Sequence, residues 1–208
     1  MTPTPEQTIA GRDLDERILE TTLDLGEELG WENVRLHQVA ERLELPLVQI
    51  AARYRDLDAV ANAWFTRARD TMLEAADERL RALPPPERLH AVIMRWFDAL
   101  RPHRELTGEI LSEKLYLSHP HHWVPMIFDL SRLIHWFLDA ATIRSTGRQR
   151  QLAEVGLTLI FLATLRVWLR DQTPEQLRTR SFLRRQLESA DRRLARRGIR
   201  PAVDHKSV

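Results

Sequence analysis

The sequence of 208 residues contains no cysteine, only seven glycines and only two lysines, Lys114 and Lys206. Without cysteine the chain has no disulfide bond, thiolate metal site or cysteine nucleophile, and this composition is typical of a reducing compartment. We therefore expect the protein to lie in the cytoplasm. The few glycines and the short β-branched runs favour helices over strands.

Long hydrophobic runs are also missing. The longest apolar stretch, residues 155–169, is interrupted by Arg166 and flanked by Glu154 and Arg170, whereas a membrane span needs about 20 apolar residues. The N-terminal residues lack the basic and then apolar pattern of a secretory signal. With 43% hydrophobic residues the chain still has enough apolar side chains for a core. We expect a soluble protein with no membrane span.

Motifs of known catalytic chemistry do not occur in the sequence. It has no glycine-rich phosphate loop, no nucleophile elbow and no His-Glu-x-x-His motif. Glu109 and Glu113 lie four residues apart, a spacing that surface ion pairing explains. His119, His121 and His122 surround Pro120 without a nearby carboxylate, so no known metal-ligand spacing is met. We expect no enzyme activity, no cofactor and no metal.

Apolar residues recur at helical spacing along almost the whole chain, and about nine helices are predicted. A helix over residues 13–29 precedes a short helix over 36–43, a turn at Glu44, and a helix from Pro46 to about Tyr54. Asp56 is the expected N-cap of a long helix that ends before the three prolines at 84–86. Further helices are expected at the ranges 87–100, 103–115, 124–142, 148–170 and 174–196. The chain is therefore predicted to be all-α, with a helix-turn-helix head at 1–56, a helical body at 57–200 and a flexible tail at 201–208.

Residues 35–60 give the most informative pattern, because they match a helix-turn-helix followed by a long helix. The segment Val39-Ala40-Glu41-Arg42-Leu43, the apolar residues Leu45 and Ile50, and the segment from Asp56 to Val60 match without a gap. In these residues the chain resembles the TetR family of bacterial transcriptional regulators. The resemblance implies an all-α fold, a homodimer, binding to operator DNA, and regulation by a small ligand bound in the body.

The resemblance places the DNA-reading residues on the third helix and on the helix before it. We expect Gln49 to read adenine and the arginines to bind phosphates. The predicted DNA-binding residues are Arg35, Gln38, Leu47, Gln49, Arg53, Tyr54 and Arg55.

Two features of the head count against DNA binding. Residues 1–60 contain six arginines and thirteen acidic residues, a net charge of −7, which repels phosphates. The third helix also carries the apolar pair Leu47 and Val48, where the family's pattern has polar donors.

A second resemblance supplies an alternative function. The segments 100–104, 167–174 and 179–185 are similar to the TetR-fold accessory proteins of ubiquinone biosynthesis, which bind lipid instead of DNA. The basic segment 166–208, with a net charge of +7, is a candidate for contact with anionic lipid. A lipid- or isoprenoid-binding accessory protein is therefore the alternative to a DNA-binding regulator.

The remaining predictions concern the helical body, residues 57–200. The predicted helix at 148–170 is too apolar for the surface of a monomer, so it and the helix at 174–196 are expected to form a homodimer interface, as the resemblance also implies. A small apolar ligand or lipid is expected between body helices. Its predicted contacts are Trp96, Trp123, Ile127 and Phe137.

Overall fold

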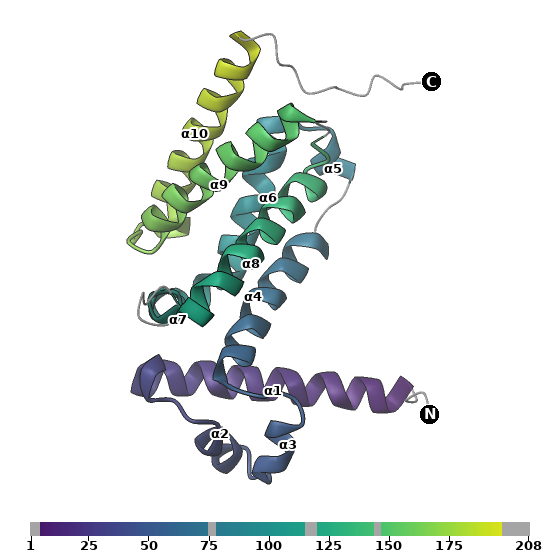
Figure 1. Ribbon diagram of the computed structural model, residues 1–208, viewed down its shortest axis with the longest axis vertical. Helices are drawn as coiled ribbons and strands as arrows, with labels where there is room; N and C mark the ends of the chain where they lie inside the picture. The colour runs from purple at the N-terminus through teal and green to yellow at the C-terminus, as the bar shows by residue number, and fades with distance from the viewer. Residues whose placement is uncertain (1–4, 75–77, 115–119, 144–146, 197–208) are drawn as a thin grey trace. The chain divides into compact units, whose positions relative to one another are not determined.

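The computed structural model of the chain describes residues 5–74, 78–114, 120–143 and 147–196, apart from the side chains of residues 5–11, 120–128 and 148 (Figure 1). This described part is helical and contains no strand, which confirms the predicted all-α fold. The α-helices are α1 (Pro5–Leu29), α2 (Leu36–Arg42), α3 (Leu47–Ala51), α4 (Leu57–Glu74), α5 (Glu78–Arg81), α6 (Pro85–Leu100), α7 (Arg104–Lys114), α8 (Pro120–Ala140), α9 (Arg148–Trp168) and α10 (Leu177–Arg196). The 3₁₀ turns are η1 (Trp31–Asn33), η2 (Arg101–His103) and η3 (Pro174–Gln176).

The chain forms two compact units. The first consists of residues 1–67 and 100–116, and the second consists of residues 68–99 and 117–208. The boundaries fall inside α4, at the end of α6 and between residues 116 and 117, so α4 and α6 belong partly to each unit. The predicted tail at 201–208 lies outside the described residues.

The first unit has a small apolar core at its helix-turn-helix. Ile18 and Leu25 of α1, Val39 of α2 and Ile50 of α3 are fully or almost fully buried together with Val34. These residues recur at helical spacing within each element, which is why the pattern could be recognised in the sequence. Asp56 caps α4 as predicted, because its Oδ1 accepts a hydrogen bond from the backbone N–H of Ala59 at 2.7 Å.

Helix α7 packs on the head within the same unit. The indole N–H of Trp64 on α4 donates to the Thr107 hydroxyl on α7 at 3.0 Å, and that hydroxyl donates to the carbonyl of His103 at 2.7 Å. The backbone N–H of Trp31 donates to the Glu109 carboxylate at 3.0 Å. At Gly26 the helices approach so closely that a β-carbon there would lie 2.7 Å from Leu106. The head, the start of α4 and α7 therefore form one packed body.

The second unit is built around aromatic side chains. Trp96 and Phe97 of α6, Phe137 of α8, and Phe161 and Trp168 of α9 are all buried. Their ring centroids lie 5.2–6.4 Å apart in edge-to-face, tilted and stacked pairs, the separations that aromatic rings prefer. Helices α9 and α10 run side by side in this unit (Figure 1).

The connection from α9 to α10 differs from the sequence-based expectation. The last helix was predicted to begin at residue 174, but φ is positive at Glu175 and Gln176, and α10 begins at Leu177. The Thr173 hydroxyl still accepts a hydrogen bond from the backbone N–H of Arg178, in the first turn of α10, at 3.1 Å. The buried Asp171 adds to this cap, because it accepts hydrogen bonds from the backbone N–H groups of Thr173 and Thr179 at 2.9 and 2.8 Å and from both hydroxyls. A carboxylate satisfies two donors of each threonine, which a single hydroxyl cannot do.

The Gln176 side chain bridges Trp168 of α9 and Asp98 of α6. Its side-chain oxygen accepts a hydrogen bond from the Trp168 indole N–H, and its amide nitrogen donates to Asp98 on α6 at 2.5 Å. Arg180 makes a bidentate contact with the same Asp98 carboxylate at 2.7 and 2.8 Å. These bonds attach the α9–α10 connection to α6.

Because the pKa of Asp171 differs between the folded and unfolded chain, we predict that the stability of the protein depends on pH. Burial raises its pKa, but the four hydrogen bonds from Thr173 and Thr179 outweigh burial and lower the pKa to about 2. A folded-state pKa below the unfolded value of 3.8 contributes stability above pH 4, which is lost as the pH falls from about 4 towards 2. Asp171→Asn should therefore lower the free energy of unfolding at pH 7 by about 2 kcal/mol. Urea denaturation at pH 7 and pH 3 measures the loss, which should be smaller at pH 3. The exposed Asp129→Asn is the control and should change little.

Candidate nucleic-acid interface

The turn between α2 and α3 sets the direction of α3. Glu44 has a φ of +55°, and the backbone N–H of Leu45 donates to the carbonyl of Ala40 at 2.9 Å. Pro46 is extended and precedes the first residue of α3, so its missing N–H costs no helical hydrogen bond. The turn holds Ile50 in the core and leaves the opposite side of α3 on the surface.

The outward side of α3 is mostly apolar. Leu47 is 50% exposed and Val48 is 71% exposed, and Gln49, Ala51 and Ala52 are exposed as well. Large apolar side chains are common on protein surfaces singly, but here they are neighbours on the helix that a helix-turn-helix presents to DNA. We call these five residues, 47–49, 51 and 52, the reading face.

The predicted donors next to the reading face are engaged with α1. The guanidinium of Arg53 pairs with the Asp15 carboxylate at 3.2 Å, and the Tyr54 hydroxyl donates to the Asp15 carbonyl at 3.4 Å. Burial, and then the nearby Asp15 carboxylate, raises the pKa of the Tyr54 hydroxyl, so it stays protonated at neutral pH. Arg53 and Tyr54 thus hold the C-terminal end of α3 against α1.

The donors of α2 are engaged with the local backbone. The Arg35 guanidinium donates to the carbonyls of Glu32 and Val34 at 2.8 Å each, and the Arg35 backbone N–H donates to the Gln38 side-chain oxygen at 2.7 Å. Gln38 therefore helps to cap α2. Arg55 contacts Asp56 at 2.9 Å while its side chain remains 80% exposed.

Local pairs neutralise part of the negative charge of the head. Arg67 contacts the carboxylates of Glu16 and Glu20, and Arg42 makes a bidentate contact with Glu28 at 2.7 Å. Since α1 supplies all three of these carboxylates, its acidic residues are partly compensated without any DNA.

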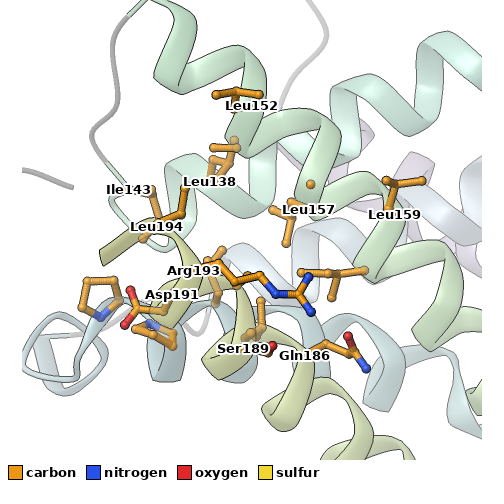
Figure 2. Close-up of a pocket in the computed structure, with 18 of the residues that line it drawn as sticks. Leu138, Ile143, Leu152, Leu157, Leu159, Gln186, Ser189, Asp191, Arg193 and Leu194 are labelled. Carbon is orange, nitrogen blue, oxygen red and sulfur yellow. The ribbon is translucent and has the colours of Figure 1, made fainter. Parts of the chain in front are cut away.

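The structure describes the side chains of two of the four residues predicted to bind a ligand. Trp96 and Phe137 belong to the packed aromatic core, and the side chains of Trp123 and Ile127 lie outside the described residues. A groove of about 490 Å³ instead lies among α6, α8, α9 and α10. Figure 2 shows Leu152, Leu157 and Leu159 on one side of it and Gln186 and Ser189 of α10 opposite.

An apolar stripe on α9 forms a second exposed surface. Leu152, Val155, Leu159 and Leu162 are 57%, 62%, 64% and 42% exposed, and they follow the alternating three- and four-residue spacing of helices that pack side by side. Gln149–Trp168 is one helix of the described chain that is long and apolar enough to cross a membrane by length and composition, with 22% of that window buried.

No cluster of metal-binding side chains occurs in the described part of the chain. His119 lies outside the described residues, and so do the side chains of His121 and His122.

These observations define the class of the protein. A compact helix-turn-helix joined by α4 to a helical unit with an exposed apolar helix is the architecture of helical one-component regulators. The chain is 36% identical to the TetR transcriptional regulator from Nitrosomonas europaea ATCC 19718, with a TM-score of 0.77, over 86% of this chain and 98% of that chain. The chain therefore belongs to the TetR family of transcriptional regulators.

A more distant structure shows the same fold. A TetR-like transcriptional regulator from Rhodococcus sp. RHA1 is 15% identical with a TM-score of 0.51, over 85% of this chain and 94% of that chain. No family model matches the sequence, and a comparison with curated proteins gives no match. The likeness to the regulator from Nitrosomonas europaea does not support the alternative of a lipid-binding accessory protein.

Because Glu44 has a left-handed backbone conformation, we predict that glycine at this position stabilises the protein. A side chain at φ +55° costs about 1–2 kcal/mol relative to glycine, and the greater freedom of glycine in the unfolded chain offsets part of the gain. Glu44→Gly should therefore raise the free energy of unfolding by about 1 kcal/mol, measured by urea denaturation. Glu44→Ala is the matched control, because it removes the charge but keeps the β-carbon. Equal stabilisation by both variants would mean that charge, and not backbone strain, is the cause.

Proposed function

We propose that the protein is a cytoplasmic, dimeric transcriptional regulator that binds operator DNA through its head and responds to a small apolar ligand in its second unit. The observation that carries the proposal is the likeness to a TetR regulator over nearly the whole of that relative. The exposed reading face of α3, which the buried Ile50 anchors to the core, supports DNA binding.

The stripe on α9 supports the dimer. The four exposed apolar residues lie along one face of the helix, and burial of this face against another apolar surface is favourable. Gly156 and Ala163 lie between the leucines of the same helix, and small residues allow close approach of a second helix. A second copy related by a two-fold axis would supply the same stripe, so that each stripe covers the other. We propose that α9, together with α10, forms the homodimer interface.

The groove supports the apolar ligand. Its volume lies within the range of about 300–1,000 Å³ that is usual for small-molecule sites. Its lining is mainly leucine, isoleucine, alanine and proline, with polar groups supplied by α10. Leu152 and Leu159 belong both to this lining and to the stripe, so a bound ligand would alter the surface that the partner contacts. Native mass spectrometry of the purified dimer, before and after solvent extraction, tests for such a ligand.

DNA binding is tested by a mobility-shift assay on the purified dimer with DNA flanking its own gene, at about 50 and 200 mM salt. A specific shift that weakens with salt is expected, because released counterions drive phosphate contacts. No shift at the lower salt from a folded dimer would argue against the regulator.

A substitution that breaks the Arg53–Asp15 pair can be tested in the same assay. Asp15→Asn should raise DNA affinity about three- to fivefold, the magnitude of one exposed ion pair, because it releases the Arg53 guanidinium for a phosphate. Asp24→Asn is the matched control, since it removes one exposed charge from α1 but leaves the Arg53–Asp15 pair intact. Equal gains in both variants would assign the effect to net charge alone.

If the apolar stripe forms the dimer interface, a charge placed on it should weaken the dimer. Leu159→Glu places a carboxylate where the partner's apolar stripe would lie, so the dimer should dissociate at least tenfold more readily. Sedimentation equilibrium measures the change. Gln149→Glu introduces the same charge at an exposed position of α9 on another side of the helix and should leave the dimer intact. An unchanged dimer with Leu159→Glu would place the interface elsewhere.

A further inference from the structure

The reading face contains one polar side chain. Val48 and Ala52 project opposite the buried Ile50, because successive helical residues are rotated by about 100°. Gln49 and Ala51 flank them. Leu47, Val48 and Gln49 are the first three residues of α3, the part of a recognition helix that reaches base edges.

Guanine recognition is disfavoured at this surface. The commonest specific contact to guanine is a bidentate arginine or lysine at its O6 and N7 atoms. None of the five residues of the reading face is cationic. The two nearest predicted arginines are held by other groups, Arg53 by Asp15 and Arg35 by two backbone carbonyls.

The same side chains suit A·T base pairs. Thymine is the base that carries a C5-methyl group in the major groove, and apolar side chains recognise it by contact. Glutamine matches adenine, since its amide accepts from N6 and donates to N7. Ala51 and Ala52 are small, so the helix can approach the base edges closely.

We propose that α3 reads thymine methyl groups with Val48 and Leu47 and one adenine with Gln49, so that each operator half-site is A·T-rich beneath this helix. The inference rests on the proposed function, because it assumes that the head binds DNA.

The size of the reading face favours DNA over a protein partner. A stable protein interface needs about 800 Å² and 20–30 residues on each side, whereas this face has five residues, of which two are alanine. A DNA contact needs only a few side chains at base edges, because phosphate contacts elsewhere supply most of the affinity.

The test uses the full-length protein. Sequences that bind it are selected from a random duplex library at about 50 mM salt, and the enriched site is remade with deoxyuridine in place of single thymidines. Deoxyuridine lacks only the C5-methyl group. At the contacted positions we expect a loss of affinity of about fourfold, which is ~0.8 kcal/mol, the contribution of one buried methylene-sized group. The Val48→Ala variant should lose most of this sensitivity, whereas Leu29→Ala, at an exposed leucine of α1, should retain it.

Gln49→Ala tests the adenine contact separately. It should reduce the preference for adenine at one position by about tenfold, with little change at the other positions.

The outcomes separate the inference from the function on which it rests. A guanine-dominated site, or equal affinity for the thymidine and deoxyuridine probes, would overturn the inference and leave the DNA-binding regulator standing. Failure of a folded dimer to enrich any sequence would overturn the DNA-binding function itself.

Discussion

The arrangement of the first unit depends on a buried hydrogen-bonded chain from Trp64 through Thr107 to the carbonyl of His103. It fixes α4 to α7, two helices about forty residues apart in sequence, and Trp64 is 1% exposed. A buried indole N–H needs a partner, so separating the two helices would leave it unsatisfied. The His103 ring also contacts Glu27 of α1 at 2.7 Å. The head, the start of α4 and α7 are therefore packed as one body within the first unit.

This coupling bears on the proposed regulation. The chain passes from the first unit to the second within α4, returns at the end of α6 and crosses again between residues 116 and 117. The first two crossings lie near the residues of the hydrogen-bonded chain, since Trp64 lies on α4 and His103 on η2. A rearrangement of the second unit would thus reach the head through covalent helical connections. A ligand would act on DNA affinity only to the extent that it binds one arrangement better than another.

The sequence was sufficient to predict most of the helices and the position of the helix-turn-helix. Val39, Ile50 and their neighbours alternate with polar residues at the helical period, and Pro46 and Asp56 mark helix starts by local chemistry. Contacts between distant residues carry no such signal. The Arg53–Asp15 pair spans 38 residues, and the role of Asp171 depends on a backbone path with two positive-φ residues. The residues that line the groove were not predicted for the same reason, because they come from four separate helices.

The apolar stripe on α9 also bears on how the proposed dimer would be made in the cell. A monomer leaving the ribosome would expose Val155 and Leu159 to water, whereas association would cover them. Association that accompanies folding makes the apparent stability depend on protein concentration. At low expression levels a larger share of chains would remain monomeric and would be more readily unfolded and degraded. The abundance of such a regulator would therefore rise more steeply than the rate of its synthesis.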